Sequence, residues 1–501
     1  MPQNRRSPPG IARDESITPH NTSVCQSGDR PFAESVRTSL RSSDGIRAEF
    51  WYSRKQAMLL VAGLFILTRI FGSLTPPFQS PDEYNHIARA YLLSKGVLAV
   101  GSREGRTGAG IDEGLLAYMD CFRQFTFDYG VKVDSLTVRV CEEIHFTGRR
   151  RFSDLLLWNT AMYFPLPYAP QAVALLFGEK VGLTVSNSYY LARLFSSCAT
   201  LALLMLALTI YPVPPAALAI FLMPMCLFQL SSASLDAMTF GITALAASLF
   251  LRGCRREGSF NATLHSVLAV CLFLLATSRI VYVALTPLLL VLYGVRRSPI
   301  YVISFVAILA LSLAWIIFAL TTVPGQGAIA PAISPSEIIR YYVTHPLAYF
   351  AVVFRTLTDA STIRSYWQMF VGILGQFDTP IGFFAYVAFA IELLAILIVS
   401  NSVASFRSLN YGHLALACSA AATLVLLLLA ALAAMTPHPA TLIQGIQGRY
   451  FYPIALLFLF TCSTGHRSGR WITLSFALLA LTAASSVELA VPRLLARYYT
   501  H

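Results

Sequence analysis

Residues 75–96 read TPPFQSPDEYNHIARAYLLSKG and directly follow the first long apolar run of the chain. Ser80 has the side chain of a helix N-cap, and proline, as at position 81, is favoured in the first helical position. Glu83 then occupies the third helical position, where it would complete a capping box with Ser80. The stretch therefore predicts a helix that begins at Pro81.

Three ionisable residues share one face of this expected helix. Asp82, His86 and Arg89 are separated by four and then three residues, a spacing that places side chains on the same side of a helix. A neighbouring stripe is apolar and can rest on the membrane or on other helices. We expect a polar helix at the membrane surface, with a stripe that consists of Tyr84, Ile87 and Tyr91.

The composition is that of a polytopic membrane protein. Of the 501 residues, 56% are hydrophobic and 12% are charged, and the mean hydropathy is +0.61. Soluble domains carry roughly 25% charged residues. We expect an all-α protein with eleven or twelve transmembrane helices. The first run covers residues 58–74, and the others cover 163–180, 188–210, 213–230, 235–251, 262–278, 280–295, 299–320, 382–400, 411–433, 451–465 and 472–491.

The net charge of +12 does not indicate nucleic-acid binding, because the arginines lie in short clusters between apolar runs. Such clusters set the orientation of membrane proteins. Arg47, Arg54 and Lys55 precede the first run and place the N-terminus in the cytoplasm. Residues 1–50 lack helical periodicity and are expected to be a disordered cytoplasmic tail. Residues 51–501 would form the transmembrane domain, whose first run is too far from the N-terminus to be a cleaved signal peptide.

Alternation of the spans places residues 75–159 and 321–380 outside the cytoplasm as two large loops. The shorter segments 231–236 and 437–450 fall on the same side. Three apolar runs lie between the first outer loop and residue 231, but only an even number of them can cross the membrane if both segments are outside. The proline-rich run at 163–180 is therefore expected to lie at the interface or to re-enter.

Two of the nine cysteines, Cys121 and Cys141, lie in the first loop. If that loop is exported, the two thiols can form a disulfide. The basic run at 149–151 in the same loop is either a solvated charge run or a patch for an anionic lipid or sugar phosphate. The spacing of cysteine and histidine does not suggest zinc.

The polar residues in or beside the apolar runs collect on the outer side. Ionisable groups at membrane depth are costly and usually mark a site or an ion pair. Their convergence predicts a polar cavity that opens outward, and the absence of a Walker motif argues against an ATP-driven engine. These residues are Asp82, Glu83, His86, Asn159, Gln171, Gln229, Asp236, Arg279, Arg364, Gln368, Asp378, Gln447, Arg449 and Tyr450.

Simpler interpretations stand beside the functional one. Glu83 can merely complete the capping box, and His86 can be an ordinary helix-surface histidine. Asp236 and Arg449 can simply pair with each other. The helix macrodipole would keep the pKa of Asp82 low, which suits a metal ligand or an electrostatic partner better than a proton donor.

Four sequence pieces resemble one bacterial family of predicted multi-pass membrane proteins, catalogued as domain of unknown function 2142. They are PPFQSPDEYNH after the first run, YAPQA near Tyr168, SSASLD before Asp236, and QGRYFYP near the C-terminus. The resemblance covers the chain from about Lys55 to the last run. That family is in turn similar to the GT-C glycosyltransferases, which share a first outer loop with an acidic motif.

The resemblance implies a sugar donor linked to a polyprenyl phosphate, used at the outer face of a bacterial plasma membrane. Its acceptor would be a saccharide, a lipid or a protein. Asp82 would be catalytic, with Glu83 beside it, and Asp236 would be the second outer acid. If the enzyme needs Mg²⁺ or Mn²⁺, Asp82 and Asp236 would be the ligands. The expected substrate-binding residues are His86, Arg89, Asp236, Arg279, Gln447, Arg449 and Tyr450, of which the arginines suit the donor phosphate.

Two other functions use the same features. A transporter or flippase of a lipid-linked or exported saccharide would need the same polar cavity and arginines. The hydropathy shows no internal repeat, which many transporters have. A scaffold protein of an envelope-assembly complex is the third alternative, and it predicts that Asp82 tolerates substitution.

Overall fold

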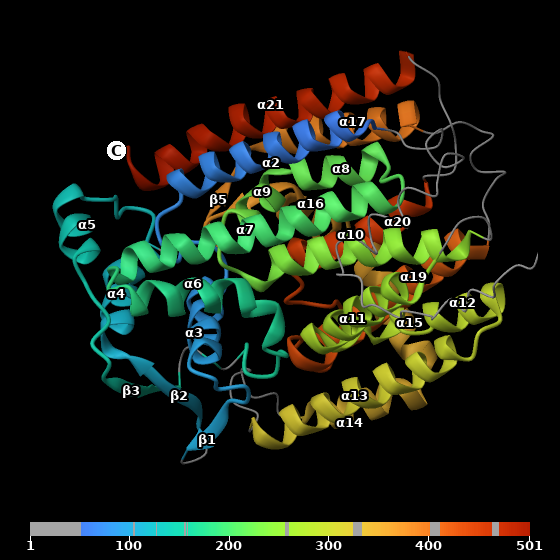
Figure 1. Cartoon of the computed structure of the whole chain (residues 1–501), viewed down its shortest axis with the longest axis horizontal. Coiled ribbons are helices and arrows are strands. Elements are labelled where there is room, and N and C mark those ends of the chain that lie inside the picture. Colours follow the sequence, from blue (N-terminus) through green and yellow to red (C-terminus); the bar gives the residue numbers. More distant parts are fainter. Residues whose placement is uncertain are drawn as a thin grey trace, which may run out of the picture.

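The long apolar runs of the sequence fold into helices that lie side by side in a bundle (Figure 1). The computed structural model describes residues 52–103, 106–126, 128–154, 157, 159–255, 260–323, 333–400, 411–462 and 470–500, so the expected disordered tail lies outside the described residues. The fold class, an all-α polytopic membrane protein, is confirmed. Seven described helices are long and apolar enough to cross a membrane: α2 (Arg54–Leu74), α7 (Val185–Ile210), α10 (Leu235–Cys254), α13 (Ile300–Thr322), α17 (Phe383–Ser400), α19 (Tyr411–Ala434) and α21 (Arg470–Tyr498).

The seven helices of span length are fewer than the eleven or twelve transmembrane helices expected, because several apolar runs in the described part of the chain form shorter or broken helices. Proline lacks a backbone N–H and forces the preceding residue out of the helical region. Met223, before Pro224, accordingly has an extended backbone and splits the run at 213–230. The shorter elements are α6 (Ala169–Lys180), α8 (Pro215–Leu222), α9 (Pro224–Leu230), α11 (Ala262–Ser278), η3 (Ile280–Leu285), α12 (Leu288–Arg296) and α20 (Tyr452–Thr461).

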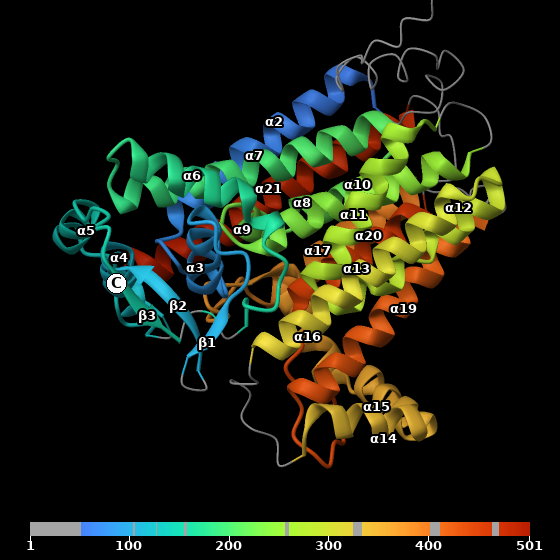
Figure 2. The same cartoon turned by 60° about the horizontal axis from the view of Figure 1, so that its bottom comes forward.

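The first loop folds into a domain at one end of the bundle (Figures 1 and 2). Its three-stranded antiparallel sheet has the order β1-β2-β3, and the basic run at 149–151 contributes to the exposed strand β3. The run at 163–180 packs into this domain as η2 and α6, which contacts α3 and α7. The elements are α3 (Glu83–Ser94), β1 (Gly101–Arg103), β2 (Arg106–Asp112), α4 (Glu113–Arg123), α5 (Ser135–Glu142), β3 (Arg150–Ser153) and η2 (Leu166–Tyr168).

The helix α3 is buried in this domain, and its apolar stripe rests on other helices, which is one of the two alternatives expected for it. Ile87 and Tyr91 of the predicted apolar stripe pack in a core with Phe78, Tyr118 and side chains of α7. His86 and Arg89, on the predicted polar face, are buried as well. A helix enclosed on both faces can hold its polar groups in a fixed position.

The described part of the second large loop is mostly helical, and the C-terminal residues link it to the first domain. Val133 donates a backbone hydrogen bond of 2.7 Å to the carbonyl of Tyr498. Arg497 of α21 forms an ion pair of 2.8 Å with Asp378, which lies in the second loop. The elements of this loop, and the short helix that follows α19, are α14 (Pro335–Thr344), α15 (Pro346–Thr358), α16 (Ala360–Gly372), β4 (Ile373–Leu374), β5 (Thr379–Pro380) and η4 (Gly448–Phe451).

Cys121 and Cys141 form the disulfide predicted for an exported first loop, and it connects α4 to the end of α5. We expect Cys141→Ser to lower the free energy of unfolding by about 3 kcal/mol, because a cross-link of this loop length removes entropy from the unfolded chain. Thermal unfolding in detergent measures the change. Reductant should destabilise the parent and leave the variant unaffected. Equal stability of parent and variant without reductant would contradict the prediction.

Candidate functional site

Asp82 precedes α3 in a left-handed backbone conformation, with φ of 61°. The helix therefore begins at Glu83, and the expected capping box is absent. Ser80 instead donates a hydrogen bond to Gln229 at 3.5 Å. Aspartate adopts this conformation more readily than most residues. Since its carboxylate makes no capping hydrogen bond, it is available to groups outside the helix.

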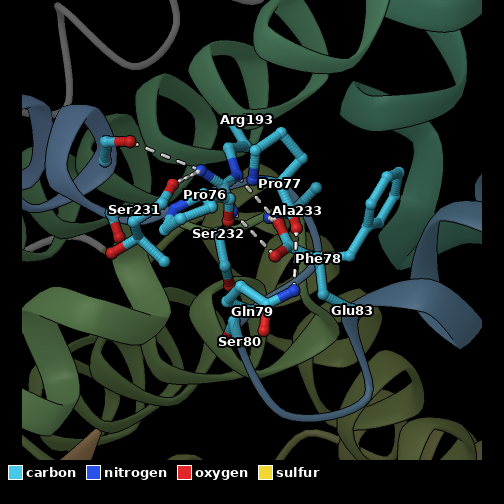
Figure 3. Close-up of polar contacts among 12 residues, drawn as sticks. Pro76, Pro77, Phe78, Gln79, Ser80, Glu83, Arg193, Ser231, Ser232 and Ala233 are labelled. Carbon is cyan, nitrogen blue, oxygen red and sulfur yellow. Dashed lines mark hydrogen bonds and ion pairs between the residues drawn. The ribbon is translucent and has the colours of Figure 1, made fainter. Parts of the chain in front are cut away.

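Glu83 is fully buried and forms a bidentate ion pair with Arg193 of α7 (Figure 3). Its Oε1 and Oε2 accept hydrogen bonds of 2.9 Å from Nε and Nη2 of Arg193. Oε1 also accepts a hydrogen bond of 2.9 Å from the backbone N–H of Ala233. Both carboxylate oxygens are engaged and the residue is closed to solvent, which favours a positioning role for Glu83 over the expected catalytic one.

Arg193 also holds the end of the first span. It donates hydrogen bonds to the carbonyls of Thr75 at 2.9 Å, Pro76 at 3.2 Å and Gly72 at 3.4 Å. Figure 3 shows Pro76 and Glu83 beside the guanidinium. The pair therefore joins α2, α3, α7 and the turn before α10 at one point. Arg193 was not among the residues predicted from the sequence, although an arginine in an apolar run was a usable signal.

Four charged side chains next to this pair contact one another in a row, which we call the chain of charges. Arg449 donates to Asp82 through Nη2 and to Oδ2 of Asp236 through Nη1, the latter at 2.9 Å. Arg279 donates to the other oxygen of Asp236 at 2.6 Å. The order of the contacts is Asp82–Arg449–Asp236–Arg279. The expected pairing of Asp236 with Arg449 is therefore present, as the central link of this chain of charges.

The neighbours of Arg449 fix its orientation. Its Nε donates to the side chain of Gln447 at 2.7 Å, and Nη1 also donates to the carbonyl of Pro81 at 3.1 Å. The ring of Tyr450 lies 4.4 Å from the guanidinium carbon of Arg279 and 5.3 Å from that of Arg449. Such cation–π contacts stabilise the two guanidinium groups beside the ring. The QGRY segment is thus part of the site, not only an interfacial anchor.

The two ends of this chain of charges are partly accessible to solvent, and its middle is buried. The side chain of Asp82 is 29% exposed and that of Arg279 is 14% exposed, whereas Asp236 and Arg449 are buried. Asn159 donates a hydrogen bond of 2.9 Å to Asp82. Burial raises the pKa of the Asp82 carboxyl, but Arg449 more than offsets this, so the pKa is lowered and the group is ionised at neutral pH.

His86 lies beside the chain of charges formed by Asp82, Arg449, Asp236 and Arg279, whereas Arg89 does not. The His86 Nδ1 is 2.8 Å from the Tyr168 hydroxyl, and burial lowers the pKa of His86 to about 4. Arg89 turns away and donates to the carbonyls of Leu98 at 2.6 Å and Val97 at 3.3 Å. Arg89 therefore stabilises the loop after α3, and its guanidinium is not directed at this site.

Several other expected residues lie apart from the chain of charges. Gln171 donates to Ser196 at 3.1 Å, and Gln229 accepts from Ser234 at 3.1 Å, both within the protein core. Asp378 pairs with Arg497. Arg364 and Gln368 line an apolar groove between α16 and α17. The structure thus brings only one part of the expected set together.

A divalent cation does not fit the proposed ligands. Mg²⁺ takes oxygen ligands, with carboxylates that can face the ion. Here the guanidinium of Arg449 bridges Asp82 and Asp236, and Arg279 takes the other oxygen of Asp236. Within the described part of the chain, no group of three or more His, Cys, Asp or Glu side chains could hold a metal ion.

The sequence model of one family of predicted membrane proteins, domain of unknown function 2142, matches residues 64–458. The chain belongs to this family. The match includes Asp82, Asp236, Arg279 and Arg449, and so confirms the resemblance drawn from the motifs at the family level. No curated protein and no solved structure shows significant similarity to the chain. The likeness to GT-C glycosyltransferases therefore stays a prediction.

We expect Arg193→Met to lower the free energy of unfolding by roughly 3–5 kcal/mol, because it leaves the Glu83 carboxylate buried without its partner. Chemical unfolding in detergent measures the loss. The double variant Arg193→Met/Glu83→Gln should recover part of it. As a matched control, Arg123→Met breaks only the exposed pair with Asp120 and should cost at most about 1 kcal/mol. Similar losses in the two single variants would refute the prediction.

The low pKa of His86 predicts acid sensitivity. The unfolded chain binds a proton near pH 6.5 and the folded protein only near pH 4, so stability falls as the pH drops through this window. We expect this fall to be about 3 kcal/mol smaller in His86→Gln. Thermal unfolding from pH 7 to pH 4 tests the difference. Parallel curves for the parent and the variant would show that His86 does not titrate as described.

Proposed function

We propose that this membrane protein is a glycosyltransferase that uses a polyprenyl-phosphate-linked sugar at the outer face of a bacterial plasma membrane. The observation that carries the proposal is the partial exposure of the two oppositely charged ends of the chain of charges, Asp82 and Arg279. Transfer from a lipid phosphate needs a carboxylate near the acceptor hydroxyl and a cation near the departing phosphate. The two exposed ends supply one of each.

The roles follow from these positions. The acceptor hydroxyl attacks the anomeric carbon of the sugar while its proton moves to the ionised Asp82 carboxylate. The bond between that carbon and the phosphate oxygen breaks, and the polyprenyl phosphate leaves with the bonding electron pair. Arg279 faces the developing negative charge. Arg449 and Asp236 position these two groups, while Gln447 and Tyr450 position the guanidinium groups.

The location at the outer face rests on the arrangement of the spans. With a cytoplasmic N-terminus, α2 delivers residues 75–159 to the outside, and the disulfide between Cys121 and Cys141 suits an oxidising compartment. Cell-surface polysaccharide or lipid glycosylation is the process that this location favours. The partners would be the bilayer, the polyprenyl-phosphate sugar and a saccharide, lipid or protein acceptor.

We expect Asp82→Asn to reduce sugar transfer by roughly 100-fold or more, because the substitution keeps the size of the side chain and removes the proton acceptor. The full-length protein is reconstituted in vesicles with radiolabelled polyprenyl-phosphate sugars, and membrane extract serves as the acceptor. Transfer of label from the lipid to the acceptor is measured. Asp120→Asn removes an exposed carboxylate of the same domain and should leave transfer unchanged.

The other outcomes separate the alternatives. Equal transfer by the parent and Asp82→Asn would remove Asp82 from catalysis. If the parent transfers no sugar but labelled lipid crosses the vesicle membrane, the protein is a flippase. If neither activity occurs and Asp82→Asn is tolerated in cells, the scaffold role is the better explanation.

A further inference from the structure

The end of the bundle opposite the first-loop domain contains a pocket of about 620 Å³. It lies where α11 and α13 begin and α12 ends, and its lining includes Phe260, His265, Arg296 and Tyr301. None of the described lining residues is acidic. This pocket is remote from the chain of charges around Asp236, and the glycosyltransferase proposal does not use it.

His265 provides a buried polar atom without a partner. Its side chain is 7% exposed, and Nε2 lies 2.9 Å from the hydroxyl of Ser304. No described residue forms a hydrogen bond with Nδ1. If the Ser304 hydroxyl donates to Nε2, Nδ1 carries the proton. A buried donor left unpaired costs free energy, so a small movement of the imidazole that lets Nδ1 reach a ligand oxygen in the pocket would be favoured.

Arg296 provides a fixed positive charge at the same pocket. Its Nε and Nη2 donate to the carbonyls of Gly253 at 2.8 Å and Arg255 at 2.7 Å, and its guanidinium carbon lies 5.3 Å from the centre of the Phe260 ring. No hydrogen bond from Nη1 to a described residue exists. The helix α11 begins at Ala262, in the pocket lining, and adds the partial positive charge of its N-terminus.

The surroundings of the pocket are those of a lipid-facing surface. Of the seven described span-length helices, α13 is the least enclosed, with 17% of its most apolar window buried. Ile300 lines the pocket and is 46% exposed, and Ile303 and Val306 continue along the same helix with 60% and 56% exposure. Residues three apart lie on one face of a helix. A cationic pocket thus continues into an exposed apolar stripe.

We propose that this pocket binds the phosphate of an acidic phospholipid, whose acyl chains lie along α13. The anionic phosphate oxygens accept hydrogen bonds from Nη1 of Arg296 and Nδ1 of His265. A neutral phospholipid fits the apolar stripe equally well but leaves the positive charge uncompensated. The proposal therefore predicts selectivity for net negative headgroups.

The test uses the purified full-length protein in a neutral detergent, titrated with dioctanoyl phosphatidylglycerol and, separately, with dioctanoyl phosphatidylcholine. Native mass spectrometry counts the bound lipid. We expect one saturable phosphatidylglycerol site that Arg296→Gln weakens about tenfold or more. His265→Phe, which keeps an aromatic ring, should weaken it about threefold or more. Arg297→Gln is the matched control, because it removes the same charge from an exposed neighbour outside the pocket lining.

Each contrary outcome overturns the proposal. Equal binding of the two lipids, or an equal loss in Arg296→Gln and Arg297→Gln, would show that no specific headgroup site exists. Inorganic phosphate that binds as tightly as phosphatidylglycerol would indicate a soluble anion and not a lipid. If Arg296→Gln fails to fold, an unchanged phosphatidylglycerol affinity in His265→Phe still refutes the proposed contacts.

Discussion

The buried ion pair between Arg193 and Glu83 is the contact on which the end of the protein with the first-loop domain depends. It fixes the end of α2, the start of α3, the helix α7 and the turn before α10 relative to one another. An isolated charge in this environment would be very costly, so each partner requires the other. The first-loop domain is thereby attached to the bundle by a charged contact as well as by apolar packing.

This pair also sets the positions of the two acids of the site. Asp82 directly precedes Glu83, and Asp236 follows Ala233 by three residues, so the two hydrogen-bonded anchors lie next to the two carboxylates. Arg449 then approaches from a segment more than 200 residues further along the chain and bridges both acids.

The sequence predicts the site better than it predicts the local structure that holds it. Alternation of the apolar runs brings Asp82, Asp236 and Arg449 to one side, which the structure bears out. The helix start was predicted wrongly, because the left-handed conformation of Asp82 accompanies tertiary contacts with Arg449 that capping rules do not contain. Arg193 was missed, since spacing along the chain does not reveal a partner more than 100 residues away.

Stability alone does not explain the chain of charges. Buried ion pairs are often no more stabilising than apolar side chains of the same volume, and exposed pairs contribute about 1 kcal/mol or less. A purely structural network would gain nothing from leaving its last acid and last cation accessible. Asp82 and Arg279 are accessible at opposite ends of a rigid, buried Arg449–Asp236 centre. Such a centre can hold a base and a phosphate-binding cation at a fixed separation while a substrate reaches both.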